Sequence, residues 1–361
     1  MFRFGKLPSL ASGREWRSTL TASPEDRFSA SQFSFRRGWG AARNADTFRA
    51  SAIICSMTWA YRAAMSSTAS TTSAHGAAMP SIDVDGARVA YAAAGSGETV
   101  LLLHSSASSS AQWRPLTEAL QPRWHVLAPD LHGYGQTDPR PGSASPGFAD
   151  AVALADAVLA ESPEPIHLVG HSYGAAVALR FAADWPERLR SLTLIEPVAF
   201  HLLCGAPEGT AEHGLYREVA ALAADVTESA ADGDGRRGMA RFIDYWNGAG
   251  SWMRMRPEAQ SALARQAPRV ALDFRAAMTD PTRLRALRWI AVPTLILRGS
   301  TSPRPTRRIA ALAAQVLPKA RLNTIEGAGH MLPLTHPAVV NAAITDHLSR
   351  NTAARRRPAA A

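Results

Sequence analysis

The sequence predicts an α/β protein: a mostly parallel β-sheet flanked by helices, with a helical segment inserted into it. From Ser81 onward, short apolar runs alternate with longer amphipathic ones, which is typical of parallel strands joined by helices. This alternation lapses between Pro197 and Arg288, where several helices are separated by Gly and Pro signals. No repeat of roughly 20 to 50 residues occurs, which disfavours solenoids and propellers.

The expected strands are short apolar runs, and the expected helices are longer amphipathic segments. Strands are predicted at 82–84, 89–93, 99–103, 125–128, 166–169, 192–195, 294–297 and 321–325. Helices are predicted at 112–120, 149–159, 173–183, 306–316 and 337–349. Because strand and helix alternate before and after the insertion, residues 80–197 and 289–349 are expected to form one core. Residues 198–288 are expected to form a helical cap over one edge of its sheet.

The two ends of the chain carry most of its positive charge. Residues 1–79 have a net charge of +6 and residues 350–361 one of +4, whereas the remaining residues carry −1. The body therefore lacks the clustered Lys and Arg that bind phosphates, and we expect no nucleic-acid partner. Residues 1–79 show neither helical nor strand periodicity, so we expect a disordered extension there and a basic tail at 350–361.

The N-terminal extension has two interpretations. Its Arg-rich, Ser-rich and acid-poor composition fits a transit peptide. An upstream extension of the reading frame, with initiation at one of the three methionines within 57–79, would look the same, and we favour it. The apolar segment 52–64 is too short to span a bilayer, so no membrane association is expected. Cys55 and Cys204 are the only cysteines, which favours a reducing, cytoplasmic location.

Residues 170–174 read G-H-S-Y-G, with an apolar strand before them and a helix-forming run after them. G-x-S-x-G in this setting is typical of a nucleophile elbow, a sharp strand-to-helix turn that exposes a serine hydroxyl. The flanking glycines let strand and helix approach closely, and the helix N-terminus favours developing negative charge. Ser172 is therefore the predicted nucleophile.

The elbow and two further motifs resemble those of the alpha/beta-hydrolase superfamily, over nearly all of residues 81–349. Leu101–His104 resembles the strand that leads to the family's oxyanion loop. Asp130–Thr137 resembles its D-x-x-G-x-G-x-S turn, which we interpret as structural. The resemblance implies the alpha/beta-hydrolase fold, with the cap inserted after strand six, and a serine nucleophile.

A serine hydroxyl needs a general base, and His330 is the predicted one. The family places its catalytic histidine in a G-x-G-H sequence between the last strand and the C-terminal helix, and Gly327–Met331 is similar to it. By resemblance, His104 is expected to flank the site and contact the substrate.

The acid that orients the histidine is expected at a less common position. Many family members carry an Asp after the seventh strand, but Leu297–Arg304 contains no carboxylate. Some members place the acid at the end of the sixth strand, where this sequence has Glu196. An acid there can reach the same imidazole nitrogen. Alternatively, Glu196 caps the insertion or pairs with an arginine, and Ser172 and His330 act as a dyad.

The oxyanion hole is expected to consist of two backbone N–H groups. One belongs to Tyr173, directly after the nucleophile. By resemblance the other belongs to Ser106, although the family's common His-Gly is His104-Ser105 here. The polar run 105–110 follows an apolar strand, which favours a loop at the site over a flexible surface loop.

The insertion is expected to supply the substrate pocket. Met239, Phe242, Tyr245 and Trp246 share one helical face, and Trp252 follows closely. The alternative for this face is packing onto the core. We predict that Phe242, Tyr245, Trp246 and Trp252 contact the substrate, because ligand pockets are mainly apolar.

The predicted function is hydrolysis of a small to medium hydrophobic ester through an acyl-enzyme. Hydrolysis of a C–C bond and cofactor-free perhydrolysis use the same serine machinery, and a noncatalytic ligand receptor is the alternative from another class. No metal cluster, P-loop or dinucleotide fingerprint occurs in the sequence, so we expect a small-molecule substrate and neither cofactor nor metal. The oligomeric state stays open.

Overall fold

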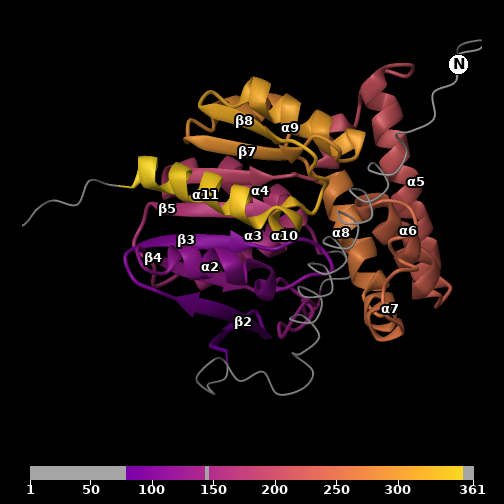
Figure 1. Ribbon diagram of the computed structural model, residues 1–361, viewed down its shortest axis with the longest axis horizontal. Coiled ribbons are helices and arrows are strands. Elements are labelled where there is room, and N and C mark those ends of the chain that lie inside the picture. The colour runs from indigo at the N-terminus through magenta and orange to yellow at the C-terminus, as the bar shows by residue number, and fades with distance from the viewer. Residues whose placement is uncertain (1–78, 143–145, 353–361) are drawn as a thin grey trace, which may run out of the picture. The chain divides into compact units, whose positions relative to one another are not determined.

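The short apolar runs of the sequence form one sheet of eight strands in the order β1-β2-β4-β3-β5-β6-β7-β8 (Figure 1). The computed structural model describes residues 79–142 and 146–352. Its strands are β1 Ser81–Val84, β2 Ala87–Ala94, β3 Glu98–Leu103, β4 Trp124–Pro129, β5 Ile166–His171, β6 Leu189–Ile195, β7 Thr294–Gly299 and β8 Ala320–Ile325. Every predicted strand lies within one of these, which confirms the predicted fold class.

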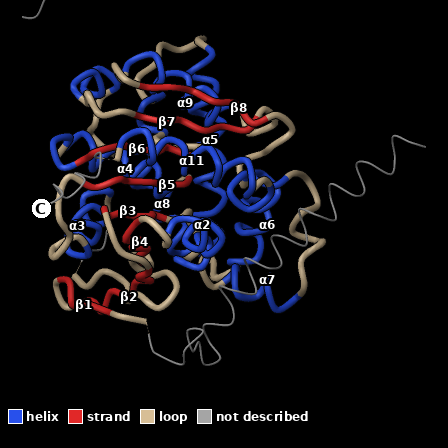
Figure 2. Tube along the Cα trace, turned by 60° about the vertical axis from the view of Figure 1, so that its left-hand side comes forward, coloured by secondary structure: helices blue, strands red, loops and turns tan. Residues whose placement is uncertain are grey.

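Strands β3 to β8 are parallel, and β2 runs antiparallel to both β1 and β4. Figure 2 shows β1 and β2 at one edge and β7 and β8 at the other. Strand β5, in the middle, is buried along its whole length, whereas β8 at the edge is mostly accessible. Central strands covered on both faces read as continuous apolar runs, which explains their clear signal in the sequence.

Helices cover both faces of the sheet. Leu101, Leu103 and Leu168 belong to a core cluster that includes residues of α3, α4 and α9, while the alternate residues Val100 and Leu102 belong to a second cluster with residues of α2 and α11. This alternation follows from the two-residue period of a strand. The helices of the core are α2 Arg114–Leu120, α3 Phe148–Val158, α4 Tyr173–Asp184, α9 Arg304–Val316, α10 Leu332–Thr335 and α11 Pro337–Asn351. Short 3₁₀ helices are η2 Ser110–Trp113, η3 Pro186–Arg188, η4 Phe200–Leu203 and η5 Leu284–Trp289.

The predicted helix at 112–120 is two elements, η2 and α2. Pro115 lies in the first turn of α2, where its missing N–H has no intrahelical partner to lose. At the other end of the chain, α11 continues to Asn351, so the first two residues of the predicted basic tail are helical.

Four helices follow β6 and precede β7: α5 Ala211–Ala231, α6 Gly235–Asn247, α7 Pro257–Ala264 and α8 Ala267–Thr279. Gly205 and Gly209 lie before α5, and Gly248 and Gly250 follow α6, all with positive φ, which glycine adopts without steric cost. Figure 1 shows these helices grouped at one end of the sheet. The prediction of a helical insertion after the sixth strand is confirmed.

Some predictions concern residues outside the described part of the chain. The expected extension at 1–79 lies outside it except for Met79, and so does Cys55, whereas Cys204 is exposed with a free thiol. Among the described residues, no helix is both long and apolar enough to cross a membrane.

Candidate active site

Ser172 occupies the turn between β5 and α4, with φ 55° and ψ −114°. Non-glycine residues rarely adopt positive φ, so the surrounding structure must hold this conformation. The Ser172 N–H donates to the Ile195 carbonyl at 2.9 Å. A Cβ on Gly170 would lie 2.3 Å from the Gly174 carbonyl oxygen, and one on Gly174 would lie 2.3 Å from a carbonyl oxygen of β3. Both glycines are therefore required by the close approach of strand and helix.

The structure brings Ser172, His330 and Glu196 into one chain of hydrogen bonds. His330 Nε2 lies 2.9 Å from Ser172 Oγ, and His330 Nδ1 lies 3.1 Å from Glu196 Oε2. An ionised carboxylate can only accept, so Nδ1 carries the proton and Nε2 is left to accept from the serine hydroxyl. The three residues are 7%, 2% and 0% exposed. A neutral imidazole in this tautomer is what a general base requires.

Glu196 is held by the loop that follows β7. Its Oε1 accepts hydrogen bonds from the Gly299 N–H and the Ser302 hydroxyl, each at 2.7 Å. A buried carboxylate is costly unless its charge is compensated, and these two donors supply part of that compensation. The loop that lacks a carboxylate therefore supports one from the neighbouring strand. Among the described residues, Glu196 has an ion pair only with His330, so its pairing with an arginine is not observed.

Two backbone N–H groups beside Ser172 are available to a ligand. Tyr173 is the first residue of α4, where N–H groups have no intrahelical partner, and Ser106 lies in the loop after β3. Within 79–142 and 146–352, neither N–H has a protein hydrogen-bond acceptor. Ala107, directly after Ser106, has φ 56°, so this loop also contains a left-handed residue.

Two cavities meet at Ser172. The smaller has about 280 Å³ of space including its open mouth, and the larger about 700 Å³. Ser106, Phe242 and Trp246 border both cavities, whereas His330 borders the larger of the two but not the smaller. Two of the residues predicted to contact the substrate, Phe242 and Trp246, therefore lie at the point where the cavities join.

A sequence model described as the alpha/beta hydrolase family matches residues 100–343. The chain belongs to the alpha/beta hydrolase family. It is also similar in fold to an alpha/beta hydrolase enzyme from a Medee basin deep-sea metagenome library. That structure has a TM-score of 0.64 and 19% identity, over 77% of this chain and 100% of the other.

Two curated relatives of this alpha/beta hydrolase differ in how much they share with it. The 2-(acetamidomethylene)succinate hydrolase of Mesorhizobium japonicum is 28% identical over 264 residues, 70% of this chain and 89% of the relative. The dihydrolipoyllysine-residue acetyltransferase component of the acetoin cleaving system of Cupriavidus necator is 39% identical over 120 residues. That match spans 33% of this chain and only 32% of the relative.

The loop after β3 of this alpha/beta hydrolase is joined to the insertion through Asp273 of α8. Asp273 Oδ2 accepts from the Ser106 hydroxyl at 2.5 Å and from the Tyr134 hydroxyl at 2.6 Å, while Oδ1 pairs with Arg269 at 2.8 Å. Burial raises the pKa of Asp273, and the positive charge of Arg269 opposes this rise. No local sequence pattern marks Asp273, because its partners are distant along the chain.

His171 contacts the loop of the candidate base from inside the elbow. Its Nε2 lies 3.0 Å from the His330 carbonyl oxygen, to which it donates. Burial, together with the nearby charge of His330, lowers the pKa of His171 to about 3. His171 is therefore neutral at physiological pH, and it holds the backbone of His330 without adding a charge to the site. In the sequence, the position of His171 directly before Ser172 was the only feature that indicated a role for it at the site.

The indole of Trp246, from α6, stacks on the imidazole of His330. The ring centroids are 4.1 Å apart and the planes are inclined by 30°. The structure thus brings a predicted substrate contact against the predicted base. Trp246 also packs against Phe242 and Phe200, so an aromatic cluster joins α6 to the site.

His104, predicted to contact the substrate, borders neither cavity at Ser172. Its imidazole is fully buried, with Nδ1 donating to the Ser105 carbonyl at 2.7 Å and Nε2 accepting from the Leu131 N–H at 2.9 Å. Since both ring nitrogens are hydrogen-bonded to backbone groups, His104 stabilises the loop after β3 instead. The structure therefore does not bring His104 to the cavities where a substrate contact was predicted.

Two aromatic residues of the insertion also lie away from these cavities. Trp252 is buried and its backbone N–H donates to Asp244 at 2.7 Å, so it packs within the insertion. The Tyr245 hydroxyl donates to Glu218 at 2.7 Å, and its ring borders a third cavity, which includes His330 but not Ser172. Consecutive residues on a helix point in different directions, so Trp246 borders the cavities at Ser172 and Tyr245 does not.

The motif at 130–137 is a turn built around a carboxylate. Asp130 accepts hydrogen bonds from the Ser110 N–H at 2.7 Å and the Gln136 N–H at 2.8 Å. A Cβ on Gly135 would lie 2.1 Å from Asp130 Oδ2. These contacts agree with the structural interpretation of the motif. In the described part of the chain, no group of three or more His, Cys, Asp or Glu side chains could hold a metal ion.

Proposed function

We propose that this alpha/beta hydrolase cleaves small to medium hydrophobic carboxylic esters through an acyl-enzyme formed on Ser172. The observation that carries the proposal is the hydrogen-bonded chain at 2.9 and 3.1 Å from Ser172 through His330 to Glu196. The strained turn under the serine supports the same function, as do the N–H groups of Tyr173 and Ser106, which have no acceptor among the residues that the structure describes. The mainly apolar walls of the two cavities support a hydrophobic substrate.

Acylation begins when Ser172 Oγ attacks the ester carbonyl carbon and His330 Nε2 takes the hydroxyl proton. The carbonyl oxygen becomes an oxyanion that accepts hydrogen bonds from the N–H groups of Ser106 and Tyr173, each worth about 10² to 10³ in rate. His330 then gives its proton to the alcohol oxygen as the C–O bond breaks. Glu196 stabilises the imidazolium throughout.

Deacylation repeats these steps with water as the nucleophile. His330 takes a proton from water, the resulting hydroxide attacks the acyl-enzyme, and the oxyanion returns to the same two N–H groups. Collapse of this intermediate releases the carboxylic acid, and the proton on His330 returns to Ser172 Oγ. The name of the Mesorhizobium relative supports hydrolysis as the reaction class.

The experiment that tests the proposal is Ser172-dependent hydrolysis of p-nitrophenyl esters, combined with labelling by a fluorophosphonate probe. We expect the wild type to hydrolyse esters and to label, and Ser172→Ala to do neither. A folded wild-type protein that neither labels nor cleaves any ester would contradict the proposal and would favour the receptor alternative. Cleavage of a vinylogous diketone but not of esters would favour C–C bond hydrolysis on the same residues.

A further inference from the structure

We infer that the two cavities that meet at Ser172 hold opposite halves of the substrate. The smaller cavity takes a short, apolar acyl group, and the larger cavity takes the alcohol. This inference rests on the proposed function, because only an acyl-transfer substrate has these two halves. It further states that the acyl side of the site limits the size of the substrate.

The position of His330 assigns the larger cavity. In acylation the imidazolium gives its proton to the alcohol oxygen, so the alcohol must lie within reach of His330. His330 borders the larger cavity together with its chain neighbours Met331 and Leu334, and it does not border the smaller cavity. The alcohol half therefore extends from Ser172 Oγ into the larger cavity.

The N–H groups of the candidate oxyanion hole assign the smaller cavity. Of the two cavities, Tyr173 borders only the smaller one, whereas Ser106 borders both, so we place Ser106 at the mouth through which the smaller cavity joins the larger. A carbonyl oxygen that accepts from both N–H groups places the carbonyl carbon between Ser172 and that mouth. Because the alcohol leaves toward His330, the acyl chain must continue into the smaller cavity.

The walls of the smaller cavity determine which acyl groups fit. They are largely apolar side chains of η4, α8 and the segment between β6 and η4: Val198, Phe200, Val270, Phe274 and Ala277. The space of about 280 Å³ includes the open mouth, compared with about 700 Å³ for the larger cavity. A short acyl chain fits such walls, whereas a long chain must displace buried aromatic rings.

Asp273, which among the described residues is the one charged side chain bordering the smaller cavity, is expected to exclude anionic acyl groups. Its Oδ2 already accepts from Ser106 and Tyr134, and its Oδ1 pairs with Arg269. A second carboxylate brought into this buried space would lie close to Asp273, and the charge of the neighbouring Arg269 is already paired with Asp273 at 2.8 Å. The acyl group is therefore expected to be uncharged.

The insertion offers a matched pair of variants that separates the two cavities. Phe274 of α8 borders only the smaller cavity, and Met255, between α6 and α7, borders only the larger. Phe274→Ala should enlarge the acyl side and Met255→Ala the alcohol side. Val270→Ala removes less volume from the acyl side and serves if Phe274→Ala does not fold.

The test compares two ester series: p-nitrophenyl esters from acetyl to decanoyl, and acetates of alcohols from methanol to octanol. For the wild type, we expect kcat/KM to fall by more than about tenfold from butanoyl to octanoyl, because each poorly accommodated methylene is costly. Across the alcohol series it should vary by less than about threefold. Phe274→Ala should raise the octanoyl-to-acetyl ratio of kcat/KM by about tenfold and leave the alcohol series unchanged. Met255→Ala should alter the alcohol series only.

The outcomes distinguish this inference from the proposed function. Ser172-dependent hydrolysis in which the wild type prefers long acyl chains overturns the inference alone, and so does an exchange of the two variants' responses. Hydrolysis of succinyl esters as fast as butanoyl esters also overturns the inference alone. If no ester in either series is cleaved in a Ser172-dependent way, both the inference and the proposed function fail.

Discussion

Two groups of one serine, one histidine and one glutamate lie at opposite ends of the sheet. The site group consists of Ser172, His330 and Glu196. The sheet-end group consists of Ser191, His167 and Glu98. In the sheet-end group, one imidazole nitrogen lies 2.7 Å from the serine oxygen and the other 3.2 Å from the carboxylate. These distances resemble those of the site group, so side-chain spacing alone does not separate the two.

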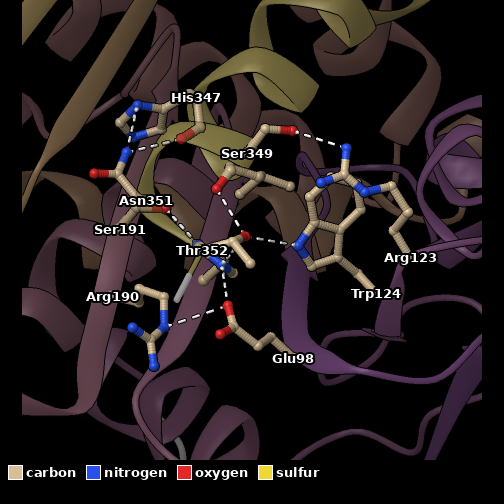
Figure 3. A network of polar contacts seen from close by, with 11 residues as sticks. Glu98, Arg123, Trp124, Arg190, Ser191, His347, Ser349, Asn351 and Thr352 are labelled. Atoms are coloured by element: carbon tan, nitrogen blue, oxygen red, sulfur yellow. Dashed lines mark hydrogen bonds and ion pairs between the residues drawn. The ribbon is translucent and has the colours of Figure 1, made fainter. Parts of the chain in front are cut away.

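The sheet-end group belongs to a network that joins the C-terminal end of α11 to the amino ends of the strands. Figure 3 shows Glu98 beside Arg190, and Trp124 beside Thr352. Arg190 Nε lies 3.4 Å from the Glu98 carboxylate, and Trp124 Nε1 donates to Thr352 Oγ1 at 3.2 Å. These contacts connect β3, β4, β6 and the end of α11, so the network's role is structural.

The two groups differ in the backbone conformation of the serine and in the space around its hydroxyl. Ser191 lies within β6, paired in register with His167 of β5, and it is fully buried. Ser172 lies on a positive-φ turn and borders two cavities, next to the N–H of Tyr173, which has no acceptor in the described part of the chain. A serine hydroxyl held by an imidazole becomes a candidate nucleophile only where a carbonyl carbon can reach it and the oxyanion can be bound.

Replacement of each serine by alanine should distinguish the site group from the sheet-end group most clearly. We expect Ser172→Ala to lower kcat for ester hydrolysis by about 10⁶-fold, the scale seen when the nucleophile of a serine protease is removed. Ser191→Ala should leave kcat within about twofold of the wild type, because no substrate reaches this residue. Steady-state assays on folded proteins, checked by circular dichroism, measure both. A comparable loss in the two variants would mean that the site is misassigned.

The two glutamates provide the second comparison. Glu196→Gln should lower kcat by about 10⁴-fold, because an amide no longer fixes the tautomer of His330 or stabilises its imidazolium. Glu98→Gln should leave kcat within about threefold, since His167 contacts no reacting atom and takes no part in proton transfer during the reaction. The same ester assay measures both effects. Near-normal turnover of Glu196→Gln would leave Ser172 and His330 acting as a dyad.

The site residues that could be predicted are those whose role is indicated by a local sequence pattern. The turn around Ser172 and the loop before His330 each depend on adjacent glycines, and Glu196 ends a recognisable strand. Asp273 and Ser302 have no such pattern, because they act on residues that are distant in sequence: 167 residues separate Asp273 from Ser106, and 106 separate Ser302 from Glu196. For the same reason the eight strands could be predicted, whereas the direction of each aromatic side chain in the insertion could not.

Ser302 allows a smaller test of how the site group is supported. Ser302→Ala removes one of the two neutral donors to Glu196 Oε1 and leaves the Gly299 N–H in place. A hydrogen bond to a buried charge is worth about 1.5 to 3 kcal/mol, so we expect kcat to fall by about tenfold or more. Ser300→Ala is the matched control, because its hydroxyl donates to the exposed Glu326 at 3.0 Å. Equal losses in both variants would show that the loop as a whole, rather than this donor, sustains activity.

The smallest effect on activity, with a measurable effect on stability, is expected for His167→Gln. Burial lowers the pKa of His167 to about 4, although the hydrogen bond with Glu98 opposes this shift. As the pH falls from about 6.5 to 4, the unfolded chain takes up a proton that the folded protein does not, so the free energy of unfolding decreases. Glutamine is neutral in both states and removes this contribution.

Urea unfolding at pH 7 and pH 5 measures the contribution of His167 directly. The wild type should lose about 2 kcal/mol more of its free energy of unfolding between these two pH values than His167→Gln does. The other buried histidines titrate in both proteins, so their contributions cancel in this difference. The variant should retain the wild-type kcat/KM at pH 7, because its imidazole contacts no reacting atom. An identical loss of stability in the two proteins would show that His167 is already protonated in the folded state, and a loss of activity would show that the two ends of the sheet are coupled.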